Sequence, residues 1–453
     1  MMRTSLLVAI ALPAASALGA RDLSGDYTVS VDGRPVEVIR VPTPEKAYSP
    51  RLREPYSYAM FTADGTCEVT VKCSITGMAS VAILPASKGV KPLRQSGDSV
   101  TFRMTPPMTL AVEPAGRDRA LVITAAKPER NAPKEGDRGV RFFGPGCHKP
   151  GIIRLGDAET LYLAPGAWVE GAVVGKGRNM RICGQGVLSG ASYSWLSGPA
   201  EDGVSAKGGM VRLSGEDIEV RDVTLFSSYG WTLVFDGVTN AVADCVKIVG
   251  GRVINDDGID VCRAKGVTVR NCFIRAQDDS VVPKWWCEDL TVSNCVFWAD
   301  YATAVRIGYE CDDGATGRKM RNLVFRDIDV LHLSVKKSPP TEYWTEVAFL
   351  VQPSHDQVFE NILIENVRFH EAEKRDYLLV VRTQPITEGY RFDRAGTLRG
   401  LALRDIKLPP SDGGMGVWLE AHDEAHPIEG VRFENVTGYG SVVRRGKVDF
   451  AAD

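Results

Sequence analysis

Short stretches in which apolar and polar residues alternate recur along most of the chain. Residues 267–276 and 290–299 read VTVRNCFIRA and LTVSNCVFWA, so one pattern returns at an offset of 23 (290 − 267). Alternation with a period of two predicts β-strands rather than helices. The same unit recurs with an Asn or Asp anchor at Asp222, Asp244, Asn271, Asn294, Asp327, Asn366, Asp405 and Asn435.

The spacing of these anchors predicts how the strands stack. The step from one anchor to the next ranges from 22 (244 − 222) to 39 (366 − 327). A repeat of about 22 residues with insertions is what a right-handed parallel β-helix needs, because each coil stacks on the next. The polar anchor falls at the turn, where its side chain can bond backbone groups. A leucine-rich repeat is disfavoured because the strands are rich in Val, Ile and Cys and lack regular Leu spacing. We expect a right-handed parallel β-helix over residues 139–453.

The region before residue 139 has another strand pattern. Runs such as DYTVSVD at 26–32, CEVTVKC at 67–73 and ALVIT at 120–124 lie between turn residues. Several short strands at such spacing predict a β-sandwich, here over residues 21–138. A stretch rich in Pro, Gly and charge at 128–139 is typical of a linker. The chain is therefore expected to be all-β, with a sandwich followed by a β-helix.

The N-terminal segment, residues 1–20, predicts export. Arg3 precedes an apolar run over residues 6–18, which ends in small residues. This order is typical of a signal peptide, and the run is too short for a confident membrane span. We expect a secreted or periplasmic protein whose mature chain does not span a membrane.

Charge and cysteine content exclude some other functions. The net charge is −3 and no basic block is present, so nucleic-acid binding is not supported. The chain has ten cysteines, but no Cys-x-x-Cys or paired His spacing predicts a zinc site. Neither a metal nor a cofactor is expected. Cys287 and Cys311 lie about one repeat apart, which leaves a disulfide between them open.

Two acidic pairs carry the strongest chemical signal. Asp256–Asp257 and Asp278–Asp279 lie at an offset of 22 (279 − 257), which is one coil of the expected β-helix. Neighbouring coils are about 4.8 Å apart, so these carboxylates become neighbours and repel one another. Such repulsion raises the pKa of at least one of them. A protonated acid beside ionised carboxylates is the arrangement that glycoside hydrolysis uses.

Two other interpretations of the acidic pairs stay open. Both segments are also good turn sequences, so the aspartates could have a structural role alone. The protein would then be a carbohydrate-binding protein without turnover. The carboxylates could alternatively hold calcium in a polysaccharide lyase, with Lys284 or Arg306 as its base.

The motif Asn255-x-Asp257-Gly258, followed by Asp278-Asp279, resembles the signature of the polygalacturonase-like right-handed β-helix hydrolases. These are glycoside hydrolase family 28 and the related dextranase–isopullulanase group, family 49, which places a β-sandwich before the β-helix. The resemblance covers roughly residues 140–450.

The resemblance implies a pectin-lyase-like β-helix and an inverting hydrolase acting on a polysaccharide or oligosaccharide. Asp278 would be the general acid, and Asp257 and Asp279 would activate water. The Gly-His-Gly and Arg-x-Lys motifs of polygalacturonases are not at the expected places, and Asp256 replaces the usual Thr. Galacturonan is therefore in doubt, and a neutral or differently modified polysaccharide is more open.

Side chains near the acidic pairs are expected to contact the sugar, since aromatic faces stack on sugar rings and cations bind hydroxyls or acidic groups. Tyr229 and Trp231 are expected one coil earlier on the same groove. Insertions near 310–320, 334–346 and 384–398 are expected to shape the ends of the groove. The six histidines have no useful spacing and are expected to be exposed. The candidate substrate-binding residues are Asn255, Lys284, Trp285, Trp286, Tyr301, Arg306, Tyr309 and Glu310.

Overall fold

The structure is a computed structural model that describes most of the chain. The described residues are 22–42, 54–201, 204–206, 208–333, 347–371, 377–385, 393–410 and 413–453. The predicted signal peptide lies outside them, as does the expected insertion at 334–346. Among the described residues, no helix has the length and apolar character that crossing a membrane requires.

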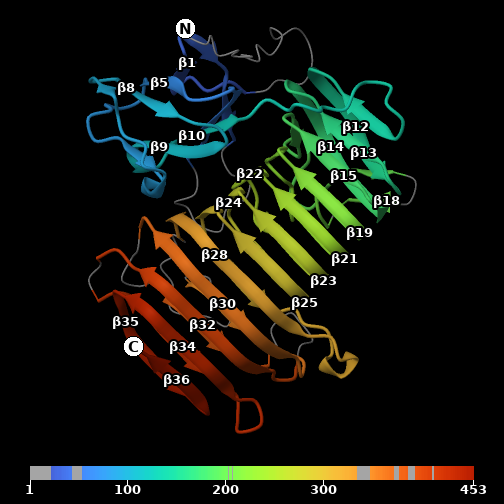
Figure 1. Cartoon of the computed structure of the whole chain (residues 1–453), viewed down its shortest axis with the longest axis vertical. Helices are drawn as coiled ribbons and strands as arrows, with labels where there is room; N and C mark the ends of the chain where they lie inside the picture. The colour runs from blue at the N-terminus through green and yellow to red at the C-terminus, as the bar shows by residue number, and fades with distance from the viewer. Residues whose placement is uncertain are drawn as a thin grey trace.

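The N-terminal strands form two facing sheets, drawn in blue in Figure 1. The sheets have the strand orders β2-β1-β5-β8-β7 and β3-β4-β10-β9-β6. Apolar side chains that alternate along the strands, such as Val69, Phe102 and Ile123, fill the space between them. The elements are β1 (Tyr27–Val31), β2 (Arg34–Val36), β3 (Val38–Val41), β4 (Tyr56–Thr62), β5 (Cys67–Cys73), β6 (Ala82–Leu84), the 3-10 turn η2 (Ala86–Lys88), β7 (Arg94–Gln95), β8 (Ser99–Met104), β9 (Met108–Arg117) and β10 (Leu121–Ala126).

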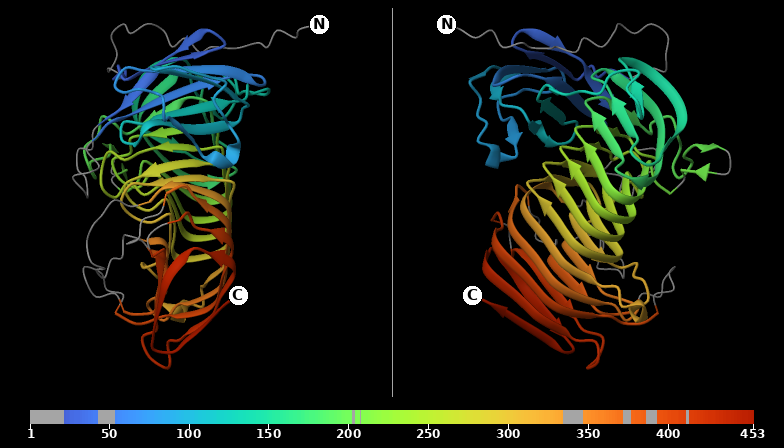
Figure 2. Two further views of the ribbon diagram at one scale, coloured as in Figure 1. Left: turned by 90° about the vertical axis from the view of Figure 1, so that its left-hand side faces the viewer. Right: turned by 45° about the vertical axis from the view of Figure 1, so that its right-hand side comes forward.

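The remaining strands wind into a parallel β-helix, in which each strand pairs with the strand one coil later (Figures 1 and 2). The earlier coils contain β11 (Val140–Phe143), β12 (Gly146–Leu155), β13 (Thr160–Leu163), β14 (Ala167–Arg178), β15 (Arg181–Gly184), β16 (Val187–Ser189), β19 (Val211–Arg221), β20 (Thr224–Phe226), β21 (Leu233–Asp244), β22 (Lys247–Val249), β23 (Ile259–Arg270) and β24 (Phe273–Ala276). A separate two-stranded sheet consists of β17 (Ala200–Glu201) and β18 (Val204–Ser205).

The later coils extend the same sheet to the end of the chain. They contain β25 (Val281–Ser293), β26 (Val296–Ala299), β27 (Val305–Gly308), the 3-10 turn η3 (Gly314–Thr316), β28 (Met320–His332), β29 (Val347–Gln352), β30 (Val358–Phe369), β31 (Tyr377–Arg382), β32 (Thr397–Lys407), β33 (Met415–Glu420), β34 (Ile428–Thr437), β35 (Tyr439–Arg445) and β36 (Val448–Ala452). The predicted all-β class, a sandwich followed by a parallel β-helix, is confirmed. The domain boundary at residues 138–139 stays a prediction.

The register agrees with the sequence repeat. Val267 pairs with Leu290, as the two matching units predict, and Ile259 pairs with Val281 in the same pair of strands. The predicted anchors form a ladder at one corner, where Asn294 donates to Asn271 and Asn271 donates to Asp244, each at 2.7 Å. Most anchors have a positive φ, which Asn and Asp tolerate better than other residues with a Cβ.

One anchor lies next to its predicted place. Asp244 pairs with Arg221, so Cys245 takes the corner position, with φ of 54°. The sequence analysis also missed a second ladder at another corner, in which Asn361 donates to Asn322 and Asn322 donates to Asp289.

The cysteines are free thiols throughout. Cys287 lies opposite Met320, whereas Cys311 lies opposite Trp285. The two thiols therefore occupy different positions along their coils, and the disulfide left open by the sequence is absent.

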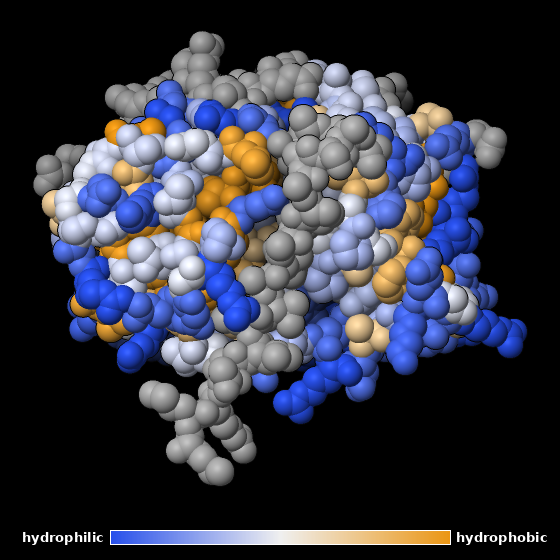
Figure 3. All heavy atoms as spheres, turned by 90° about the horizontal axis from the view of Figure 1, so that it is seen from above, coloured by the Kyte–Doolittle hydropathy of each residue, from blue (hydrophilic) through white to orange (hydrophobic). Residues whose placement is uncertain are grey.

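The sandwich packs against the side of the β-helix. Tyr58 and Val122 of the sandwich share an apolar cluster with Phe226, Phe273 and Trp298 of the β-helix. Seen from above, this end of the molecule shows patches of apolar residues among polar ones (Figure 3). Among the described residues, the large apolar side chains that are exposed are Leu23 and Leu93.

A charged cluster joins the two parts at one end of this contact, and we call it the seam cluster. His332 of β28 lies 2.7 Å from Glu113 of β9 and 2.5 Å from Glu371. Arg117 of β9 also pairs with Glu371. His332 is only 5% exposed, so the expectation of an exposed histidine is wrong here.

The seam cluster contains a further carboxylate, Asp329 of β28. Asp329 accepts hydrogen bonds from Ser87 at 2.8 Å and from Arg368 at 2.8 and 2.9 Å, and His370 lies 3.1 Å away. The seam cluster is therefore Ser87, Glu113, Arg117, Asp329, His332, Arg368, His370 and Glu371.

Candidate active site

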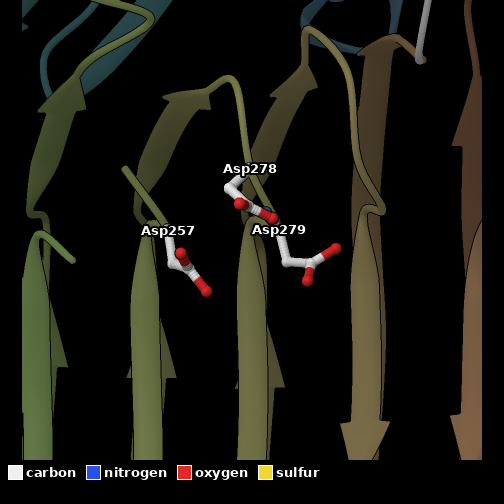
Figure 4. A group of neighbouring side chains, drawn as sticks. All are labelled: Asp257, Asp278 and Asp279. Atoms are coloured by element: carbon white, nitrogen blue, oxygen red, sulfur yellow. The ribbon is translucent and has the colours of Figure 1, made fainter. Parts of the chain in front are cut away.

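The three predicted aspartates come together on two neighbouring coils. Asp257 ends the turn before β23, and Asp278 and Asp279 end the equivalent turn before β25 (Figure 4). The amide of Gly258 donates to the carbonyl of Asp279 at 2.9 Å, which fixes one turn on the next. One carboxylate oxygen from each aspartate lies within 4.8 Å of the others. The spacing of one coil therefore places these carboxylates as predicted, while their catalytic roles stay a prediction.

Asp278 has the surroundings of a proton donor. Its side chain is half-buried, whereas Asp257 and Asp279 are each 3% exposed. Burial, followed by repulsion from Asp257 and Asp279, raises the pKa of Asp278 to about 8, although Arg306 and Lys284 oppose this. Asp278 is therefore mostly protonated at neutral pH.

Asp279 has the partners that a carboxylate anion needs. Its Oδ1 accepts hydrogen bonds from the backbone amide of Thr303 at 2.8 Å and from the Thr303 hydroxyl at 2.6 Å. Its Oδ2 lies 2.8 Å from Nε of Arg306, a residue of β27 that is itself buried. Asp279 is thereby fixed in one orientation.

Asp257 keeps one oxygen available. Its Oδ2 accepts a hydrogen bond from Lys284 at 3.2 Å, while its Oδ1 has no hydrogen-bond partner among the described residues. Burial raises the pKa of Asp257, Lys284 opposes this, and Asp260 and Asp279 add to it, so that the pKa lies well above its usual value. An unpartnered buried oxygen is costly unless water or a ligand occupies its lone pairs.

Lys284 of β25 contacts carboxylates on every side. Its Nζ lies 3.2 Å from Asp257, 3.0 Å from Asp260 and 3.3 Å from Glu310. Burial lowers the pKa of Lys284, but the three carboxylates outweigh it and hold that pKa well above its usual value. Lys284 and Glu310, two predicted substrate contacts, thus pair with each other. Asp260, which lies on β23 and is fully buried, was not singled out from the sequence.

Asp256 supports the turn instead of facing the other three. It is fully buried and accepts backbone hydrogen bonds from Gly251 at 2.6 Å, Gln277 at 2.7 Å and Asp278 at 3.2 Å. Burial raises its pKa to about 8 despite these donors. Asp256 thus holds the turn that carries Asp278.

Aromatic side chains cover one side of the carboxylates. Trp231 lies 3.8 Å from Nζ of Lys284, measured to the ring centre, and 6.3 Å from the ring of Trp285. Trp285 and Trp286 are half-buried, and Arg263 and Arg318 lie over their rings at 4.1 and 4.7 Å. The positive φ of 60° at Trp285 is rare for a bulky residue and is often found at functional sites.

The remaining predicted contacts differ in accessibility. Tyr301 and Tyr309 are 7% and 6% exposed, and the ring of Tyr309 lies 5.1 Å from Arg306. Asn255 is half-buried at the turn before Asp257. Tyr229 is fully buried and donates to the carbonyl of Ala206 at 3.1 Å, so the expectation that it lines the groove is wrong.

The donor set fits a metal ion poorly. Both oxygens of Asp279 are used by Arg306 and Thr303, and Oδ2 of Asp257 is used by Lys284. A calcium ion takes six to eight oxygen ligands and would be repelled by the two fixed cations. We therefore assign no cation to these aspartates.

Comparisons with known proteins agree with the predicted resemblance. The profile described as "Glycosyl hydrolases family 28" matches residues 159–338, a range that includes all three aspartates. Isopullulanase from Aspergillus niger is 28% identical over 210 residues, which are 43% of this chain and 35% of that protein. Dextranase from Arthrobacter sp. (strain CB-8) is 28% identical over 236 residues, which are 46% of this chain and 34% of that protein. The match thus spans little more than a third of these relatives.

Solved structures share the fold. Dex49A from Penicillium minioluteum superposes with a TM-score of 0.65 at 15% identity, covering 96% of this chain and 95% of that chain. The polygalacturonase from Erwinia carotovora ssp. carotovora gives a TM-score of 0.50 at 15% identity, covering 68% of this chain and 86% of that chain. The predicted resemblance to the β-helix glycoside hydrolases of families 28 and 49 is confirmed.

Proposed function

We propose that the protein is a glycoside hydrolase that cleaves glycosidic bonds in a polysaccharide. The observation that carries this proposal is the group of three aspartates within 4.8 Å, of which the half-buried Asp278 has its pKa raised to about 8. One carboxyl group is thus a proton donor beside two others that have cationic partners. The similarity to family 28, isopullulanase and dextranase supports the same reaction class.

The geometry supports a role for each aspartate. Asp278 donates its proton to the glycosidic oxygen as the bond from that oxygen to the anomeric carbon breaks. The free Oδ1 of Asp257 accepts a proton from a water molecule, whose oxygen bonds to the anomeric carbon. Asp279, held by Arg306 and Thr303, helps to orient that water and stabilises positive charge on the sugar ring. The products are two shorter chains, one of which carries a new reducing end.

We propose a single displacement with inversion. The separation of at most 4.8 Å between oxygens is short for this, since inverting enzymes usually have carboxyl groups about 6.5–9.5 Å apart. The contacts of Asp279 nevertheless argue against attack by that carboxylate, because two hydrogen bonds from Thr303 bind one of its oxygens and the ion pair with Arg306 holds the other. Nuclear magnetic resonance of the fresh product shows the anomer directly, and retention would exclude the single displacement.

The charges at the site favour a neutral sugar polymer. Lys284 and Arg306 are both paired with carboxylates, and Arg263, over Trp285, lies 3.1 Å from Asp236. Binding a uronate carboxylate at any of these three cations would need that cation to leave its partner, whereas Arg318, the fourth cation at the tryptophans, lies over the ring of Trp286 at 4.7 Å. The rings of Trp285 and Trp286 offer apolar faces on which a sugar can stack.

The lyase alternative lacks a suitable base. A lyase removes a proton from a uronate ring, which requires a neutral amine if Lys284 is the base. The three carboxylates around Lys284 keep it protonated, and their pKa effect is opposite to what that reaction needs. The same holds for Arg306, the other candidate base: burial lowers its pKa, but Asp279 and Asp278 outweigh this and raise that pKa above its usual value.

The first test is release of reducing ends from dextran, pullulan and polygalacturonate, with and without EDTA. We expect turnover of a neutral polymer that survives EDTA and is lost in Asp278→Asn. Activity that disappears in EDTA, with products that absorb in the ultraviolet, would support the lyase instead. Binding without turnover, unchanged by Asp278→Asn, would identify a carbohydrate-binding protein.

We also propose that the protein acts outside the cytoplasm. The predicted signal peptide at residues 1–20 and a polymeric substrate both favour export. N-terminal sequencing of protein recovered from the medium or periplasm checks this, and a retained Met1 would contradict it.

A further inference from the structure

Lys284 is the centre of a buried group in which carboxylates outnumber cations. Nζ of Lys284 lies within 3.3 Å of Asp257, Asp260 and Glu310. The side chains of Lys284, Asp257 and Asp260 are 7%, 4% and 0% exposed, and that of Glu310 is 12% exposed. We call these four residues the lysine cluster.

One ammonium cannot balance three buried carboxylates. A buried charge without a partner is so costly that the group takes up a proton instead. The ring of Trp231 covers Lys284 at 3.8 Å and limits the access of water that would otherwise screen the charges. At least one carboxyl group of the lysine cluster therefore holds a proton near neutral pH.

Asp260 is the best placed of the three to hold that proton. It is fully buried on β23, and apart from its contact with Lys284 its oxygens have no hydrogen-bond partner among the described residues. Burial raises its pKa to about 7, against the opposing effect of Lys284, and Glu310 and Asp278 raise it as well. Burial also raises the pKa of Asp257 well above its usual value, against the opposing effect of Lys284. The difference between the two lies in geometry: Oδ2 of Asp257 accepts a hydrogen bond from Lys284, whereas neither oxygen of Asp260 accepts one among the described residues, so Asp257 is the member that Lys284 favours as an anion.

We propose that Lys284 and Asp260 are a positioning pair that sets which carboxyl group is ionised: Lys284 keeps Asp257 charged as the base, and Asp260 holds the displaced proton. This inference rests on the proposed function, because it gives Asp257 a reason to be ionised. Neither residue touches the reacting bond. Both act through Asp257.

The groups around the pair define what can influence it. The Cys262 thiol of β23 is buried beside Asp260 and Lys284. Asp278 faces Asp260 from the next turn, and the ion pair of Asp279 with Arg306 lies beyond it. The surroundings thus contain two cations, and Arg306 is already committed to Asp279.

The first test needs no activity. Asp260 binds more protons in the folded chain than in the unfolded chain between its ordinary pKa and about 7, so the free energy of unfolding falls as pH rises through that window. Urea unfolding of Asp260→Asn should show a shallower fall between pH 4 and 7 than wild type. An unchanged slope would mean that Asp260 is not the proton holder and would overturn the inference.

The second test measures kcat/KM against pH on whichever of dextran or pullulan the wild type cleaves. Lys284→Met should move the acidic limb up by about one to three pH units, because an opposite charge of this kind lowers a carboxyl pKa by that much. Asp260→Asn should move the acidic limb down, since Asp257 no longer shares Lys284 with it. Loss of activity with an unmoved limb in both variants would show a merely structural role.

Lys247→Met is the matched control. Lys247 is another buried lysine, on β22, but its Nζ binds the carbonyls of Asp222 and Cys245 and not the lysine cluster. Lys247→Met should leave the acidic and the basic limb of the kcat/KM profile at their wild-type pH. If the wild type cleaves neither polymer, the proposed function fails on those substrates, while the unfolding test still decides where the proton lies.

Discussion

The carboxyl groups of the candidate active site and those of the seam cluster have similar partners but opposite pKa shifts. Five carboxyl groups around the site, Asp257, Asp260, Asp278, Asp279 and Glu310, share two cations, Lys284 and Arg306. In the seam cluster, three carboxyl groups, Glu113, Asp329 and Glu371, have four cationic or titratable partners, Arg117, His332, Arg368 and His370.

The pKa values follow this balance of charge. At the site, burial and mutual repulsion raise the pKa of Asp278 to about 8. In the seam cluster, burial would raise the pKa of Glu371, but His332 and Arg117 lower it to about 2. Burial alone therefore does not decide the protonation of a carboxyl group. The number of cations within reach decides whether a buried carboxyl group holds a proton or stays ionised.

Removing the proposed proton donor, Asp278, should have the largest effect. We expect Asp278→Asn to lower turnover by about 10²–10⁴-fold, the usual contribution of a general acid. The same change should raise the free energy of unfolding at pH 7 by about 1 kcal/mol, because Asn is neutral without the proton that Asp278 has to take up on folding at that pH. Reducing-end release and urea unfolding measure the two quantities. Asp423→Asn, at an exposed loop position, is the control, and equal turnover in both variants would contradict the assigned role.

The corresponding change in the seam cluster should reverse this pattern. Asp329→Asn leaves Arg368 and His370 without their anion, and we expect a loss of about 3 kcal/mol in unfolding free energy. Turnover per folded molecule should stay at the wild-type value, because the change lies away from the aspartates. A loss of turnover without a loss of stability would show that the two regions are not independent.

The pH dependence of stability should separate the regions within one molecule. Glu371 binds fewer protons when folded between pH 2 and its ordinary pKa of 4.5, so stability rises with pH there. Asp256 and Asp278 bind more protons when folded up to about pH 8, so stability falls as pH rises from about 4 to 8. His332, with its raised pKa, adds to that fall as it loses its proton.

Urea unfolding at pH 3 to 8 tests this dependence. Glu371→Gln should flatten the rise on the acidic side, and Asp278→Asn should flatten part of the fall toward neutral pH. A wild-type stability that climbs steadily from pH 4 to 8 would contradict the raised pKa values at the site.

The smallest expected effects come from one hydroxyl in each region. Ser87 donates to Asp329 at 2.8 Å, and Thr303 donates to Asp279 at 2.6 Å. Ser87→Ala should cost about 1.5 kcal/mol of stability and leave turnover unchanged. Thr303→Val should lower kcat about tenfold, as the backbone amide of residue 303 still holds Asp279. Two results would contradict this contrast between the site and the seam cluster: a Thr303→Val variant that loses only stability, or a Ser87→Ala variant that loses only turnover.

The sequence predicted the contacts that the coil repeat sets and missed those that no repeat sets. The proximity of Asp257 and Asp279 could be predicted from their offset, because strand pairing keeps a nearly fixed interval between these two coils. Only some partners of Lys284 could be predicted. Asp260 contacts Lys284 because its strand position faces that side chain, and no repeat in the sequence shows which way a single position faces. The contact of His332 with Glu113 joins residues 219 apart and depends on how the sandwich docks, for which no repeat exists.

The corner ladders have a consequence for how this architecture can change. Leu290 pairs with Leu323, and Leu323 pairs with Ile362 across a longer stretch of chain, yet both pairs lie on the same continuous stack. Each strand pair restores the alignment of the coils, so a longer connection between two strands leaves the pairing of the later strands unchanged. Connections between strands can therefore be lengthened or exchanged while Asp257, Asp278 and Asp279 keep their places on the coils. Substrate specificity can thus change through these connections without moving the three aspartates, and the connections are the segments to redesign first.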